Sequence, residues 1–146
     1  MKFRNMKLEL KKFDKRAIVP KFAHDTDAAM DLFTYTKVAL EPGIVTRIHS
    51  GIGVEVPEGY AYILKDKSST ASRGGLTLGG VFDAGYQGEI IAVMINLTKE
   101  TIVFEAGQKV CQVVFIQVEH PQFVEVKEYS KSSNRGEGGF GSTGAK

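Results

Sequence analysis

The stretch "IIAVMINLTKETIVFEAGQKVCQVVFIQV", residues 90–118, contains three short apolar runs, and a turn signal, "FEAG", separates the last two. The runs are rich in Val, Ile and Phe, which favour extended strands over helices. None of them sustains helical periodicity over the length of a typical helix. This stretch therefore predicts consecutive β-strands.

The same pattern continues on both sides of this stretch. Further short runs are "LELKKF", "AIVPKF", "MDLFTY", "GIGVEV", "YAYIL" and "VEVKEY", with turns such as "LEPG", "VPEG" and "DAGYQG" between them. We expect an all-β fold in which only "SSTASRGG", residues 68–75, forms one or two helical turns, capped by Ser68 or Ser69. Strand spacing favours a sandwich, barrel or jelly roll, and the pattern alone does not separate these.

Composition indicates one ordinary soluble domain. The chain has 146 residues, of which 42% are hydrophobic and 25% charged, and its net charge of +2 gives no argument for a nucleic-acid or membrane surface. The opening "MKFRNMKLELKK" lacks the apolar core of a secretory signal, and the single cysteine, Cys111, has no disulfide partner. We expect a cytoplasmic protein that binds neither nucleic acid nor membrane.

The composition changes near Ser130. We expect residues 1–129 to form the β domain and residues 130–146 to form a flexible Gly-rich C-terminal arm, because the arm has little apolar surface to bury. Its segment "RGEGGFGSTG", residues 135–144, is open to two interpretations: a flexible end without a role, or a lid over a nucleotide polyphosphate. A Walker-type phosphate loop is excluded, since Ala145 stands where the lysine is needed.

Five segments in chain order resemble the motifs of the homotrimeric dUTP diphosphatases (dUTPases). They are "AAMDL" (28–32), "DKSSTA" (66–71), "GGVFDAGYQGEI" (79–90), "GQKVCQVVF" (107–115) and "RGEGGFGSTG" (135–144). The resemblance implies a β jelly roll and three identical chains around a threefold axis. It also implies Mg²⁺-dependent hydrolysis of dUTP to dUMP and pyrophosphate, a hydrolase reaction of nucleotide metabolism.

The third segment, residues 79–90, resembles a hairpin motif that in this family holds the attacking water and selects the substrate. The resemblance implies that Asp83 activates the water that attacks the α-phosphate, and that Tyr86 lies against the deoxyribose. Main-chain groups of the hairpin would recognise uracil. Taken alone, the segment "VFDAGYQG" is equally typical of a simple turn.

The remaining motifs supply phosphate and metal contacts. The resemblance implies catalytic roles for Ser68 and Gln112 at the phosphates, substrate binding by Lys67 and Ser69, and a water-mediated contact of Asp31 with Mg²⁺. Alternation alone would instead place Asp31 and Gln112 toward solvent.

The resemblance makes the arm a lid over a neighbouring chain's site. Phe140 would cover uracil, and the other contacts would come from Arg135, Gly141, Ser142 and Thr143 around the phosphates. His24, His49 and His120 have no metal-ligand spacing, and we expect them to be structural.

Two departures and two alternatives remain open. Lys67 stands where the family usually has Arg, and Asp66 adds a negative charge beside the phosphate site, which is unfavourable unless its side chain faces away or helps to hold the cation. A dCTP deaminase-related or bifunctional enzyme is one alternative, although Val93 occupies the position of the glutamate that deamination needs. A nucleotide-binding regulatory protein on the same fold is the other.

Overall fold

The computed structural model describes residues 6–131, 133 and 136, and this part of the chain forms eleven β-strands and one four-residue helix. The all-β prediction is confirmed. The strands are β1 (Leu10–Lys12), β2 (Met30–Phe33), β3 (Val38–Leu40), β4 (Val45–His49), β5 (Ile52–Val54), β6 (Tyr60–Asp66), β7 (Gly75–Thr77), β8 (Val81–Phe82), β9 (Ile91–Asn96), β10 (Ile102–Phe104) and β11 (Lys109–Gln117).

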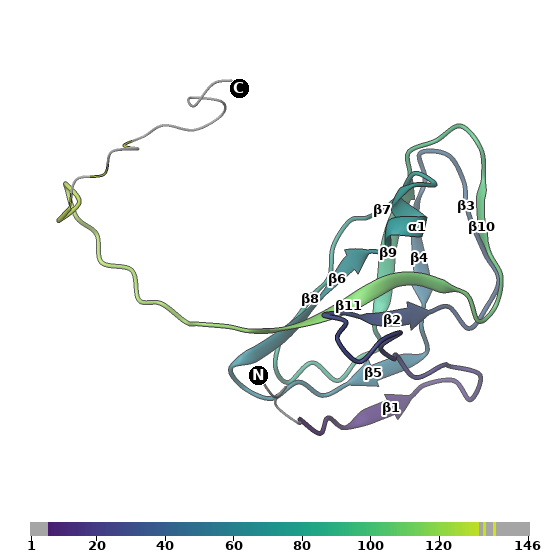
Figure 1. Ribbon diagram of the computed structural model, residues 1–146, viewed down its shortest axis with the longest axis horizontal. Coiled ribbons are helices and arrows are strands. Elements are labelled where there is room, and N and C mark those ends of the chain that lie inside the picture. The colour runs from purple at the N-terminus through teal and green to yellow at the C-terminus, as the bar shows by residue number, and fades with distance from the viewer. Residues whose placement is uncertain (1–5, 132, 134–135, 137–146) are drawn as a thin grey trace.

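Two larger sheets and two strand pairs make up the body (Figure 1). One sheet has the order β2-β11-β6-β8 and the other the order β4-β9-β7, while β1 pairs with β5 and β10 with β3. All of these pairings are antiparallel. Because these pairings join segments far apart in the sequence, the fold depends on long-range contacts.

Buried side chains from both larger sheets form one core. In β9 the burial alternates, with Ala92 and Met94 facing inward, as expected for a strand that covers the core with one face. Residues with almost no exposed surface include Leu32, Leu40, Ile48, Ile52, Tyr62, Ile90, Met94 and Phe104. This apolar burial is the main favourable contribution to folding.

Strand β11 contains a β-bulge that strict alternation does not predict. The pairing with β2 shifts between Lys109 and Cys111, and Val110 and Cys111 are both buried. A bulge of this kind re-aims the side chains on either side of it. As a result, Lys109 contacts the side chain of Asp31, the residue that lies opposite Gln112 on β2.

The predicted helical turns are confirmed as α1 (Ser68–Ala71), but the predicted cap is wrong. Lys67, in an extended conformation, occupies the N-cap position, and no side chain caps the helix. Helix α1 is instead attached to β11, because the hydroxyl of Thr70 donates a hydrogen bond of 2.9 Å to the carbonyl of Val110. This bond places the start of α1 beside the bulge.

After β11 the described chain leaves the body as an extended segment (Figure 1). The run "VEVKEY", expected as a strand, pairs with no strand there. Phe123 and Tyr129 in this segment are 95% and 91% exposed. No helix within residues 6–131 has the length and apolar character needed to cross a bilayer.

Candidate active site

Strand β11 brings three of the predicted site motifs together. Gln112 lies opposite Asp31 of β2 on one side and opposite Lys65 of β6 on the other. Because β6 leads directly into Lys67 and Ser68, the first, second and fourth motifs meet at one end of this sheet. We call Asp31, Lys67, Lys109 and Gln112 the carboxylate cluster.

Asp31 is the buried centre of this cluster, which makes its predicted solvent-facing alternative wrong. Its exposed fraction is 2%, and its Oδ2 lies 2.6 Å from Lys109 Nζ. Lys67 Nζ lies 3.5 Å from Oδ1, too far for a strong hydrogen bond, and Oδ1 has no hydrogen-bond partner. Oδ2 is therefore held by Lys109, while Oδ1 is buried beside Lys67 without a hydrogen-bond partner among the described residues.

The lysines keep Asp31 ionised. Burial raises the pKa of Asp31, but the hydrogen bond from Lys109 and the charge of Lys67 outweigh burial and lower the pKa below its ordinary value. The cluster therefore combines one carboxylate with two ammonium groups. Its net positive charge suits an anionic ligand such as a polyphosphate.

The cluster fits a Mg²⁺ ion held mainly by water and ligand oxygens. Mg²⁺ prefers oxygen ligands and retains several waters. One carboxylate oxygen without a hydrogen-bond partner is therefore a sufficient protein contribution. The described residues hold no group of three or more His, Cys, Asp or Glu side chains that could ligate a metal by themselves. Asp31 Oδ1 is thus the protein atom with which such an ion would interact.

The serines of the second motif lie beside the cluster. Ser68 and Ser69 are both exposed at the start of α1. The neighbouring Asp66 is turned elsewhere, because its Oδ1 accepts a 2.7 Å hydrogen bond from the backbone N–H of Thr77 on β7. The Asp66 carboxylate therefore satisfies a backbone N–H group of β7.

The hairpin motif forms a tight turn after β8. The backbone N–H of Tyr86 donates to the carbonyl of Asp83 over 3.2 Å, and Gly85 between them has a φ of +82°, which favours glycine. The Asp83 carboxylate is exposed and has no hydrogen-bond or ion-pair partner among the described residues. It is therefore free to bind water.

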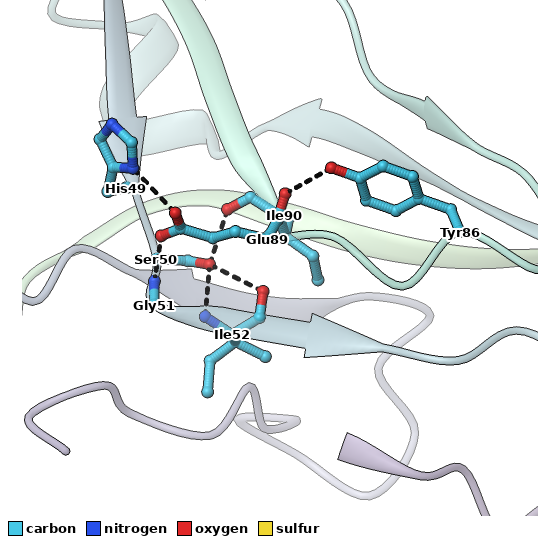
Figure 2. Close-up of polar contacts among 7 residues, drawn as sticks. All are labelled: His49, Ser50, Gly51, Ile52, Tyr86, Glu89 and Ile90. Carbon is cyan, nitrogen blue, oxygen red and sulfur yellow. Dashed lines mark hydrogen bonds and ion pairs between the residues drawn. The ribbon is translucent and has the colours of Figure 1, made fainter. Parts of the chain in front are cut away.

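The ring of Tyr86 is held in place from three directions. Its hydroxyl donates a 3.0 Å hydrogen bond to the backbone carbonyl of Glu89 (Figure 2). A Cβ on Gly88 would lie 2.4 Å from that hydroxyl, so only glycine allows this approach. The ring of Phe82 stacks on Tyr62 with 4.6 Å between ring centroids, and its centroid lies 5.6 Å from that of the Tyr86 ring.

The Glu89 side chain fastens the hairpin to the connection between β4 and β5 (Figure 2). Oε1 accepts a 2.6 Å hydrogen bond from the N–H of Gly51, and Oε2 lies 2.9 Å from Nδ1 of His49. Beside it, the Ser50 hydroxyl donates to the Ile90 carbonyl over 2.6 Å. We call Glu89 with His49 and Gly51 the hairpin clamp.

Within one chain, the hairpin and the carboxylate cluster lie at opposite ends of β6. Phe82 pairs with Tyr62, and Asp83 lines a groove of about 820 Å³ together with Ala61. Lys67 follows the far end of β6, and at about 3.3 Å per residue it lies roughly 20 Å from Ala61. A single chain therefore does not bring Asp83 to Gln112 and Ser68.

Sequence reasoning missed two residues that the structure places at these sites. Lys109 contacts Asp31 only because of the bulge in β11, which the sequence pattern does not reveal. Glu89 lies inside a recognised motif, but its partners come from the end of β4 and from the β4–β5 connection, which are distant in the sequence. Cys111 is buried, and burial raises the pKa of its thiol to about 12, which leaves it unreactive.

The predicted lid residues lie outside the described residues. These are Arg135, Phe140, Gly141, Ser142 and Thr143. Their placement therefore stays a prediction.

The chain is similar to known dUTPases over nearly its whole length. The dUTPase family model matches residues 15–144. The chain is 40% identical to the deoxyuridine 5'-triphosphate nucleotidohydrolase of Thermobifida fusca, over 97% of this chain and 81% of that protein. It is 39% identical to the protein of the same name from Alkaliphilus metalliredigens, over 95% and 98%.

Solved structures give the same answer for the fold. The dUTPase of Staphylococcus bacteriophage 80alpha, solved with dUPNHPP, has a TM-score of 0.87 and 30% identity, over 94% of this chain and 98% of that one. A mutant dUTPase of S. aureus phage phi11, described with a structural Mg(II) ion, has a TM-score of 0.80 and 24% identity, over 86% of this chain and 100% of that one. The predicted all-β jelly roll is confirmed.

Proposed function

The chain belongs to the dUTPase family, and we propose that it is a dUTP diphosphatase that hydrolyses dUTP to dUMP and pyrophosphate. The observation that carries the proposal is the carboxylate cluster. It joins a buried, ionised Asp31 to two lysines and includes Gln112, which lies opposite Asp31 in the sheet. This arrangement provides positive charge for a triphosphate and one carboxylate oxygen for its accompanying cation.

The hairpin supplies the attacking water. Asp83 accepts a hydrogen bond from this water and takes its proton as the oxygen bonds to the α-phosphorus. The bond from the α-phosphorus to the oxygen bridging to the β-phosphate breaks, and pyrophosphate leaves. The exposed, unpaired Asp83 carboxylate supports this role.

The carboxylate cluster and the start of α1 orient the phosphates. Gln112 contacts the α-phosphate, while Ser68 lies near the bond that breaks. Lys67 and Ser69 bind the neighbouring phosphate oxygens, Lys67 as a point charge in place of the bidentate arginine usual in the family. The hydrogen bond from Thr70 to Val110, which fixes α1 against β11, supports this common site.

The site binds Mg²⁺ through Asp31. Bound with the substrate, the ion would neutralise phosphate charge and make the α-phosphorus a better electrophile. Asp31 Oδ1, buried and without a hydrogen-bond partner among the described residues, is the atom that would hold this ion through water. Lys109 keeps the other oxygen occupied and so fixes the orientation of the carboxylate.

The active site is shared between chains of a homotrimer. The separation of Asp83 from the carboxylate cluster along β6 supports this arrangement, since the hairpin of one chain can complete the cluster of another. The exposed apolar side chains of Val81, Phe123 and Val124 also support association, because burying apolar surface between chains is favourable.

The C-terminal arm closes a neighbouring chain's site. Residues 1–129 form the jelly-roll domain and residues 130–146 the arm, whose Phe140 covers uracil and whose Arg135 binds outer phosphates. The extended path of the described chain after β11 supports an arm that reaches another subunit (Figure 1). The reaction takes place in the cytoplasm, with the nucleotide pool.

Pyrophosphate release tests the function directly. The purified protein is incubated with Mg²⁺ and dUTP, dCTP, dTTP or UTP, and ammonia is also measured for dCTP. We expect pyrophosphate from dUTP alone. Ammonia from dCTP would identify a deaminase instead.

A regulatory role is the second candidate. The structure of the 80alpha phage dUTPase, 30% identical to this chain, is described in a study of phage dUTPases that control the transfer of virulence genes. Tight binding of dUTP without pyrophosphate release would favour a regulatory protein over an enzyme for this chain.

A further inference from the structure

Glu89 contacts two parts of the structure. Its carboxylate bonds to His49 and Gly51, and its backbone carbonyl accepts the hydrogen bond of Tyr86. Both of its oxygens are engaged, one with Gly51 and one with His49, and its side chain is 18% exposed. A carboxylate whose two oxygens both bond to protein groups has a structural role. Here it holds the segment that follows the hairpin turn against His49 and Gly51.

The hairpin clamp fixes the backbone on which Tyr86 depends. The N–H of Ile90 donates a 2.7 Å hydrogen bond to the carbonyl of Ile52, directly after the anchored Glu89. With its side chain and the next peptide group both held by the β4–β5 connection, the Glu89 carbonyl has a fixed direction. That carbonyl is the acceptor for the Tyr86 hydroxyl.

We propose that Glu89 is a positioning residue that sets the sugar selectivity of the site by holding Tyr86 through its own backbone carbonyl. This inference rests on the proposed hydrolysis of dUTP, in which Tyr86 lies against the deoxyribose and leaves no space for a 2'-hydroxyl. A ring that is held rigidly excludes the extra hydroxyl of UTP. A ring that can tilt admits it.

Removing the carboxylate tests this directly. In Glu89→Ala the clamp is lost, and we expect the ratio of kcat/KM for dUTP over UTP to fall about tenfold, since misplacement of about 1 Å can change rates by that order or more. Glu89→Gln can still accept from Gly51 and bond to His49, so it should retain most of the selectivity. If Glu89→Gln loses as much selectivity as Glu89→Ala, the carboxylate acts through its charge and the proposal is wrong.

A double-mutant cycle separates positioning from general loss of stability. Tyr86→Phe removes the hydroxyl that the carbonyl holds, so adding Glu89→Ala to Tyr86→Phe should change the selectivity ratio little further. Independent, multiplicative effects would contradict the proposal. The matched control is Glu105→Ala, which removes a glutamate paired with Lys37 at 2.8 Å on the surface and should leave the ratio unchanged.

A spectroscopic measurement reports the ring position without turnover. The chain has five tyrosines, and in protein labelled with 3-fluorotyrosine the Tyr86 ¹⁹F signal is identified by its absence in Tyr86→Phe. We expect Glu89→Ala to shift this signal, because the Tyr86 hydroxyl loses its fixed acceptor and the ring can move relative to Phe82, and Glu89→Gln to leave it in place. An unmoved signal in Glu89→Ala would overturn the positioning role.

The two proposals fail in different ways. A wild-type protein that releases no pyrophosphate from dUTP would overturn the proposed function and, with it, the selectivity role. The ¹⁹F measurement would then still decide whether Glu89 holds Tyr86. A wild-type protein active on dUTP, with a selectivity ratio unchanged in Glu89→Ala, would overturn this inference alone.

Discussion

Lys109 Nζ lies 2.6 Å from Oδ2 of Asp31, a carboxylate with an exposed fraction of 2%. The β-bulge in β11 makes this contact possible, and the contact joins β11 to the residue proposed to face Mg²⁺. The pair therefore connects the stability of the sheet to the geometry of the site.

Lys109→Met should destabilise the protein, because it leaves Asp31 buried with only Lys67 nearby. We expect a loss of about 1–3 kcal/mol in the free energy of unfolding, measured in urea at fixed protomer concentration. The control is Lys37→Met, which breaks an exposed pair with Glu105 and should change stability by less than about 1 kcal/mol. Equal losses in the two variants would contradict a structural role for Lys109.

Stability should also depend on the ionisation of Asp31. Its folded pKa lies below the ordinary value of about 3.9, so its ionised form favours folding above that pH. This contribution is lost as the pH falls through the folded pKa. Urea unfolding of wild type and Asp31→Asn should therefore show a stability difference at pH 7 that shrinks toward pH 3. A constant difference would argue against the effect.

Asp83→Asn should retain the fold and the binding of dUTP with Mg²⁺ while losing most turnover. The wild-type carboxylate has no partner among the described residues, so its replacement removes no stabilising contact. We expect kcat to fall by about 10²–10⁴, the usual contribution of a general base, with an unchanged melting temperature. A near-normal kcat would remove Asp83 from the water-activating role.

Complementation between two inactive variants tests the shared site. Asp83→Asn alters the hairpin and Gln112→Ala alters the carboxylate cluster, which one chain holds at opposite ends of β6. Chains co-expressed with different tags should form mixed trimers in which about a third of the sites combine two intact parts. Purified mixed trimers as inactive as either parent would place both parts in one chain.

Deleting residues 135–146 should cut kcat/KM by about tenfold or more, because the lid can no longer exclude water from the bound substrate. The fold and the trimer should be retained, as judged by circular dichroism and by an elution volume that corresponds to three copies of the truncated chain. An unchanged rate would contradict the lid.

Local pattern was enough to predict most of the strands and the position of α1, although the run "VEVKEY" forms no strand. Val and Ile at alternating positions favour extended backbone, and the glycines mark turns, so these elements depend mainly on neighbouring residues. The helix cap was predicted wrongly, because the extended Lys67 took the position expected for a serine. At this position a tertiary contact overrides local preference, because the hydrogen bond from Thr70 attaches α1 to β11 directly after β6 ends.

The sequence by itself determined the strand-rich architecture and, through its ordered motifs, the family and the residue types available for chemistry. Only the tertiary structure decided that Asp31 is buried between Lys67 and Lys109, and that Glu89 fastens the hairpin to His49 and Gly51. The physical reason is that both arrangements join strands distant in the chain. Their geometry depends on sheet register and a bulge, which no local pattern encodes.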